Sequence, residues 1–125
     1  MEIQALIDKK VEKINAKIID LRRNIHENPE LGLEVFNTAA LIAKSLGELG
    51  IPYKEGVGNT GIVAVIEAKS PGPCILLRAD MDALPLTEMT GLEYSSKIEG
   101  KMHACGHDLH AAALVGVADV LWSLS

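Results

Sequence analysis

GIVAVIEAKSPGPCILLRADMDALP, residues 61–85, is the stretch of the sequence that decides the fold class. Its first six residues are mostly β-branched, which predicts a strand at 61–66. The run CILL at 74–77 predicts a second strand, apolar on both faces and therefore central in a covered sheet. A short turn rich in proline and glycine joins the two runs, so we predict that they pair antiparallel. Cys74 is accordingly predicted to be a core residue.

Helices are predicted on both sides of this segment. Apolar side chains spaced by threes and fours predict a first helix that ends near residue 28, before a proline, and a second helix at 34–49 that ends at Gly50. Residues 85–104 show no period and predict a long loop. A final helix at 108–124 is apolar nearly all round and should be buried on several sides. The predicted fold class is α/β, and the apolar last helix indicates an incomplete domain.

Composition narrows the classes of function. The chain has 125 residues, 48% of them hydrophobic, and a net charge of −5. An apolar run of about 18 residues, which a membrane span needs, is absent from the sequence. No basic stripe with interleaved aromatic residues is present, so nucleic acid is not an expected partner. The two cysteines stand in unlike settings, which predicts a cytoplasmic protein without a disulfide framework.

Histidine and cysteine are concentrated in one short segment. Residues 102–110 read MHACGHDLH and hold three of the four histidines and one of the two cysteines. Side chains two apart in an extended segment point the same way, so His103, Cys105 and His107 are predicted to converge. Thiolate and imidazole are preferred ligands of zinc and related metals. Cys105 and His107 are the strongest ligand candidates, whereas His103 and His110 are expected beside the ligands or facing a substrate.

Carboxylates near these motifs have different expected settings. Asp80 and Asp82 follow the predicted strand at 74–77, near the usual ligand crevice of an open α/β sheet. They are predicted either to bind a hard cation, to orient a metal-bound imidazole, or to form a solvated turn. Asp108 is expected to cap the last helix. Glu88, in the long loop, is expected to be solvated.

Several motifs, in matching order and spacing, resemble the M20 metallopeptidase family. The closer similarity is to its amidohydrolase branch, which includes hippurate hydrolases, auxin-conjugate hydrolases and N-acetyl-diaminopimelate deacetylases. The motifs that carry it are LRR at 21–23, His26, NPELG at 28–32, LRADMDALP at 77–85, TGL at 90–92 and MHACGHD at 102–108. The resemblance implies that residues 1–125 are the incomplete N-terminal part of a catalytic metal-binding domain. That domain would have three α/β/α layers and a mixed sheet, with the lid domain absent from this chain.

The resemblance also implies an activity and a site. It implies hydrolysis of the amide bond of N-acyl amino acids or small peptides by a site with two divalent metal ions, of zinc, manganese, cobalt or nickel. Cys105 and His107 would be metal ligands, and Asp82 would be the catalytic-site aspartate that supports the metal centre. The general base and the remaining ligands would lie downstream. The resemblance leaves open the roles of Asp80 and Asp108 and whether the protein is a homo-oligomer.

Two other classes of function are weighed against this one. A metal-binding or redox module could use Cys105 and His107 without catalysis. A non-catalytic interaction domain could be built on the first helix, whose apolar stripe would then bind a partner. Packing of that stripe on the domain's own core is the expected outcome.

Overall fold

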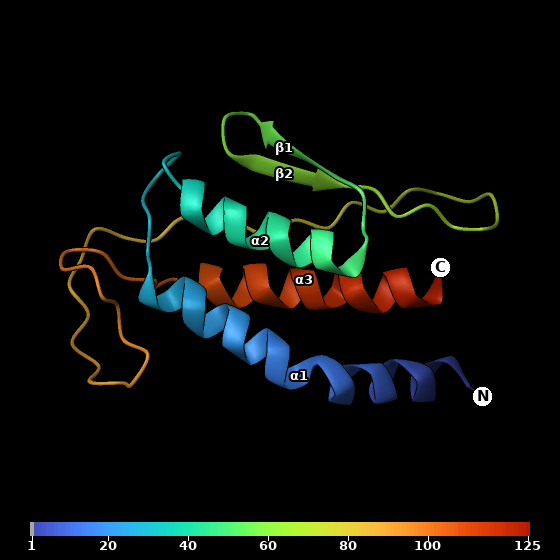
Figure 1. Cartoon of the computed structure of the whole chain (residues 1–125), viewed down its shortest axis with the longest axis horizontal. Helices are drawn as coiled ribbons and strands as arrows, with labels where there is room; N and C mark the ends of the chain where they lie inside the picture. Colours follow the sequence, from blue (N-terminus) through green and yellow to red (C-terminus); the bar gives the residue numbers. More distant parts are fainter. Residues whose placement is uncertain (1) are drawn as a thin grey trace.

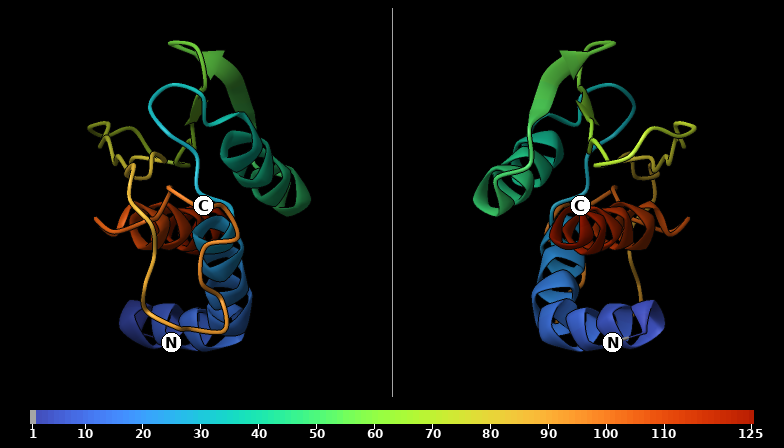
Figure 2. Two further views of the ribbon diagram at one scale, coloured as in Figure 1. Left: turned by 90° about the vertical axis from the view of Figure 1, so that its left-hand side faces the viewer. Right: turned by 90° about the vertical axis from the view of Figure 1, so that its right-hand side faces the viewer.

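The computed structural model describes residues 2–125, which form three long helices and one hairpin. The elements, in chain order, are α1 (Ile3–Glu27), α2 (Phe36–Leu49), β1 (Tyr53–Val57), β2 (Gly61–Ala64) and α3 (His107–Leu124). α3 lies between α1 on one side and α2 with the hairpin on the other (Figure 1). The end-on views of Figure 2 show the same layering. The three predicted helices are therefore confirmed, each with bounds close to those expected.

α1 packs on α3 through its C-terminal half. Leu21 and Ile25 are buried in the core cluster, together with side chains from α2 and α3. Gly116 of α3 lets the two helices approach, because a Cβ atom there would lie 3.4 Å from Cγ1 of Ile18. Ile3 at the other end of α1 is 65% exposed. The apolar stripe of α1 is thus mainly core packing, as expected.

α2 begins and ends with identifiable hydrogen bonds. Its first turn is held by Glu30, whose carboxylate accepts the backbone N–H of Thr38 at 2.6 Å and its hydroxyl at 2.7 Å. Its end is at Gly50, which has the left-handed φ of 79° that the sequence pattern predicts. Glu30 also anchors a distant segment, because its carbonyl accepts the N–H of Ala83 at 2.8 Å. The turn between α1 and α2 therefore helps to place residues near Asp82.

The hairpin differs from the prediction in its pairing. The strand predicted at 61–66 is present as β2, but its antiparallel partner is β1, with Tyr53 opposite Ala64. The run 74–77 forms no strand and pairs with no other described segment, so both the predicted second strand and its predicted antiparallel pairing are wrong. An apolar run becomes a strand only beside a chain that satisfies its N–H and C=O groups, and no described residue does so here.

Residues 74–77 are also not a core. Cys74 is exposed, and Leu76 is 87% exposed. The segment 75–77 lines an apolar cavity of about 380 Å³ together with β2 and α3. The prediction that Cys74 is a core residue is therefore wrong, because nothing among the described residues covers this face.

α3 is covered on some of its faces only. Ala111, Ala112 and Val115 are buried, whereas Leu121 is 46% exposed. The expected burial on several sides holds toward α1 and α2 but not on the face of Leu121. None of the helices in residues 2–125 combines the length and apolar character needed to cross a bilayer.

Two isolated backbone bridges help to hold the long loop between β2 and α3. Leu84 and Met102 exchange two backbone hydrogen bonds, of 2.8 and 3.0 Å. Ala83 forms an isolated bridge with Leu31, in the turn between α1 and α2. These bridges bring residues 80–84 beside the N-terminus of α3. The Asp-x-Asp motif at residues 80–82 thereby meets the Cys-x-His motif at residues 105–107, although the two are far apart in the sequence.

Candidate metal centre

His107, the first residue of α3, is oriented by Asp82. Its Nδ1 atom lies 2.9 Å from Asp82 Oδ1 and 2.9 Å from the Asp82 carbonyl oxygen. The carbonyl oxygen and the carboxylate oxygen of Asp82 are both hydrogen-bond acceptors. Nδ1 of His107 therefore carries the proton and donates the hydrogen bond. Nε2 then keeps a lone pair that is available to a metal. A carboxylate on one ring nitrogen and a metal on the other is the usual setting of a metal-binding histidine.

Asp80 lies on the other side of the same imidazole. Its Oδ2 atom is 3.8 Å from His107 Nε2. Its Oδ1 atom accepts a hydrogen bond from Arg78 Nη2 at 2.6 Å. The structure thus brings both predicted aspartates to His107, although their side chains are 38% and 42% exposed. The Asp-x-Asp motif is therefore partly exposed to solvent, but it is not simply a solvated turn, because both carboxylates lie close to His107.

Cys105 and His103 point to different surroundings. Cys105 is a free, exposed thiol, whereas His103 is 4% exposed. The predicted convergence of His103, Cys105 and His107 into one ligand set is therefore not found among residues 2–125. His103 is buried near His26, whereas Cys105 lies at a bend of the chain and is exposed.

The donor atoms fit a metal in kind but not in number. Thiolate and imidazole suit zinc and related borderline metals. His107 also has the tautomer that a metal requires, as described above. Within residues 2–125, however, no three side chains of histidine, cysteine, aspartate or glutamate are arranged to hold an ion. Cys105 and His107 alone would therefore need further donors to hold a metal ion.

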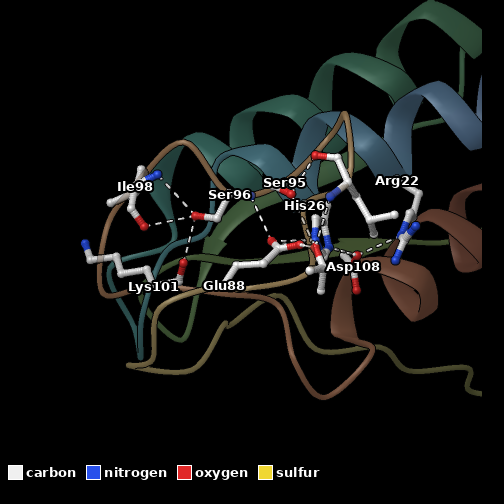
Figure 3. A network of polar contacts seen from close by, with 10 residues as sticks. Arg22, His26, Glu88, Ser95, Ser96, Ile98, Lys101 and Asp108 are labelled. Atoms are coloured by element: carbon white, nitrogen blue, oxygen red, sulfur yellow. Dashed lines mark hydrogen bonds and ion pairs between the residues drawn. The ribbon is translucent and has the colours of Figure 1, made fainter.

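A buried polar network lies behind this site, and the sequence analysis missed it (Figure 3). His26, which is 3% exposed, contacts Asp108 Oδ2 through Nδ1 at 2.8 Å and Glu88 Oε1 through Nε2 at 2.9 Å. Arg22 Nε donates to the same Asp108 oxygen at 2.8 Å. Ser96 N–H donates to Glu88 Oε1 at 2.8 Å, and the Thr90 hydroxyl donates to its other oxygen. The network joins α1, the long loop and α3.

Two predictions about these carboxylates are wrong. Glu88 is not solvated, since its side chain is 2% exposed and hydrogen-bonded. Asp108 does not cap α3, because the helix begins at His107 and the carboxylate turns toward Arg22 and His26. One signal was present in the sequence. Arg22 and His26 are four apart on α1, next to the buried Leu21 and Ile25, so they share a face with the core.

Both carboxylates are held in the ionised form. Burial acts to raise the pKa of Glu88, but hydrogen bonds from Thr90, Ser96 and His26 outweigh it and lower the pKa to about 2. Burial likewise acts to raise the pKa of Asp108, but the hydrogen bond from His26 and the charge of Arg22 give a net lowering. The network therefore places two ionised carboxylates beside the Arg22 guanidinium and the His26 ring.

His103 borders this network without joining it by hydrogen bonds. Its ring centroid is 6.5 Å from that of His26. Both ring nitrogens of His103, and Asp108 Oδ1, are buried without a hydrogen-bond partner among residues 2–125. Burial lowers the pKa of His103, which favours its neutral form. His110, on the outer side, is exposed and lies 6.3 Å from His107 between ring centroids.

Comparison with known proteins now identifies the family. Residues 76–125, which hold both the Asp-x-Asp and the Cys-x-His motifs, match the family described as Peptidase family M20/M25/M40. Thermostable carboxypeptidase 1 of Saccharolobus solfataricus is 48% identical over 122 residues, which are 97% of this chain and 31% of that protein. N-acetyl-L-cysteine deacetylase of Bacillus subtilis is 51% identical over 108 residues, covering 86% of this chain and 26% of the relative.

A solved structure supports the same conclusion. The YXEP protein of Bacillus subtilis, described as a dinuclear metal-binding peptidase of the M20 family, superposes with a TM-score of 0.86 at 39% identity. The match covers 90% of this chain and 32% of that one. These relatives are hydrolases by name, and the solved structure has an α/β part like the one described above. The chain belongs to peptidase family M20, which confirms the predicted family and fold class, and it spans about a third of its relatives' length.

Proposed function

We propose that the protein containing this chain hydrolyses the amide bond of N-acyl amino acids or small peptides. In this proposal residues 1–125 are the incomplete N-terminal part of its catalytic metal-binding domain. The observation that carries the proposal is the contact between Asp82 and His107, which leaves Nε2 of His107 free to bind a metal. The names of the relatives agree, since a carboxypeptidase and an N-acetyl-L-cysteine deacetylase both break an amide C–N bond.

Each proposed site residue has a defined task. His107 binds a divalent cation through Nε2, and Asp82 holds the imidazole in the required tautomer and orientation. Cys105 binds as a thiolate, for which its exposed thiol is accessible. His107 and Cys105 would hold part of a site for two divalent cations, which would supply polarisation of the amide carbonyl and activation of water. Asp80 sits close enough to His107 Nε2 to add negative charge beside the same cation.

The experiment uses the full-length protein. It should hydrolyse N-acetyl and N-benzoyl amino acids or dipeptides, and it should lose this activity on treatment with a chelator and regain it with zinc, manganese, cobalt or nickel. Cys105→Ala and His107→Ala should each lower the number of metal ions bound per chain, measured by atomic emission. Unchanged metal content in both variants would defeat the ligand assignment. Activity that survives complete metal removal would defeat the function itself.

A second candidate function rests on the exposure of Cys105. As a free surface thiol, Cys105 could belong to a redox or metal-binding module that has no hydrolytic activity. The two functions differ in how this thiol reacts in the metal-loaded protein. Protection of Cys105 from iodoacetamide by bound metal supports the metal site, whereas free and reversible oxidation of Cys105 supports the redox module. A cytoplasmic location, the absence of nucleic-acid partners and homo-oligomeric assembly stay predictions.

A further inference from the structure

The proposed function gives no task to the most deeply buried ion-pair network among residues 2–125. His26 is 3% exposed, and each of its ring nitrogens lies within 2.9 Å of a carboxylate oxygen. Asp108 and Glu88 thus share one imidazole as a hydrogen-bond partner, each through a different ring nitrogen. A buried polar group that lacks its partner destabilises the fold, whereas a network in which every group has a partner holds its segments rigidly. Its place in the fold indicates what the rigidity is for.

The network ties three segments together at the start of α3. His26 comes from the last turn of α1, Glu88 from the long loop, and Asp108 from the first turn of α3. Asp108 directly follows His107 in the chain. A change in the position of Asp108 therefore moves the backbone that carries His107. Because Nδ1 of His107 must also reach Asp82, the tolerance for such movement is small.

The same network also lies close to the segment that precedes Cys105. His103 is buried 6.5 Å from His26 between ring centroids, and it precedes Cys105 by two residues. Met102, one residue earlier, is fixed by its two backbone hydrogen bonds to Leu84. The segment with the two proposed ligands is therefore bounded by the network on one side and by the Asp82 region on the other.

We propose that His26 is a positioning residue: by bridging Asp108 and Glu88 it fixes the start of α3, and with it the geometry of the Cys105–His107 pair. This inference rests on the proposed function, because it concerns the metal site assigned there. His26 does not act on the metal or the substrate directly. It acts through the backbone of residues 107–108.

The test compares His26→Ala with a matched control in the full-length protein loaded with cobalt(II). The control is Glu27→Gln, which breaks the 2.9 Å ion pair from the same helix to Lys97 in the same loop but does not touch Asp108. The readouts are cobalt affinity, by chelator competition, and the thiolate-to-cobalt charge-transfer and ligand-field bands, which report the geometry around Cys105. His26→Ala should weaken cobalt binding by about 10- to 100-fold, as loss of supporting residues around a metal does, and shift the bands. Glu27→Gln should leave both unchanged.

A milder variant keeps the test decisive if His26→Ala does not fold. Glu88→Gln retains an acceptor for His26 but removes the charge, so it should give a smaller change of the same kind. Unchanged bands and affinity in whichever of the two variants folds would overturn the proposal, and so would equal effects of His26→Ala and Glu27→Gln. The wild-type protein separates this from failure of the proposed function. If the wild type binds no cobalt at Cys105, the site assignment fails, whereas a normal wild type with an unaffected variant defeats only the role of His26.

Discussion

His107 Nδ1 lies 2.9 Å from Asp82 Oδ1, although 25 positions of sequence separate the two residues. The bridges of Ala83 to Leu31 and of Leu84 to Met102 hold Asp82 in this place. The contact selects one tautomer of the imidazole and directs its free nitrogen toward Asp80. A predicted ligand and a predicted supporting aspartate thus occupy the relationship that metal-binding histidines require.

Replacing Asp82 by alanine should weaken metal binding without unfolding the protein. The variant loses the carboxylate that orients His107, while the Asp82 carbonyl contact at 2.9 Å is a backbone contact that stays. A partial loss is therefore expected, of about 10-fold and at most 100-fold in metal affinity, measured by chelator competition on the full-length protein. Glu93→Ala, which removes an exposed carboxylate of the long loop, is the control. Equal affinities of the Asp82 variant and wild type would show that His107 does not need this support.

Local patterns in the sequence predicted the helices because helix periodicity and capping are properties of neighbouring residues. The ends at Gly50 and near residue 28 follow from one glycine and one proline. The failures concern partners that are far away in the chain. Glu88 is buried because it meets His26, 62 positions away, and residues 74–77 stay unpaired because no described strand lies beside them.

In the candidate site, too, local patterns were predicted from the sequence and long-range contacts were not. Residue types and spacing singled out Cys105, His107 and Asp82, and the structure places two of them in contact. His103 does not join a ligand set because the fold buries it near His26 of α1, a long-range arrangement that spacing within residues 102–110 does not reveal. Spacing indicates only that Arg22 and His26 share a face of α1. Their carboxylate partners, Glu88 and Asp108, come from other segments and could not be predicted in this way.

Acid should destabilise the fold through Glu88. The pKa of its carboxyl group is lowered to about 2 in the folded chain, from an ordinary value of 4.5. A depressed folded-state pKa means that the unfolded chain binds the proton more tightly, so the stabilisation is complete above pH 4.5 and is lost as the pH falls from there toward 2. The shift of Asp108 has the same direction and adds to the effect.

Thermal unfolding of the full-length protein between pH 2 and pH 7, followed by circular dichroism, measures this dependence. Glu88→Gln should unfold at a lower temperature than wild type at pH 7, and the difference should shrink as the pH falls below about 4.5. Glu93→Gln, an exposed carboxylate in the same loop, should behave like wild type. A constant difference between Glu88→Gln and wild type over the whole range would contradict the lowered pKa.

Two glycines of the central segment should respond in opposite ways to alanine. A Cβ atom on Gly61, where β2 begins, would lie 2.5 Å from the carbonyl oxygen of Val57, so the hairpin backbone must shift. Gly61→Ala should therefore lower the free energy of unfolding by about 1–3 kcal/mol. Gly72 has no left-handed φ and no atom within 4 Å of such a Cβ. Gly72→Ala should be neutral or stabilise by about 0.4–1 kcal/mol, because it restricts the unfolded chain. Urea unfolding of both variants checks the pair, and equal stabilities would show that the hairpin turn does not have the close approach described here.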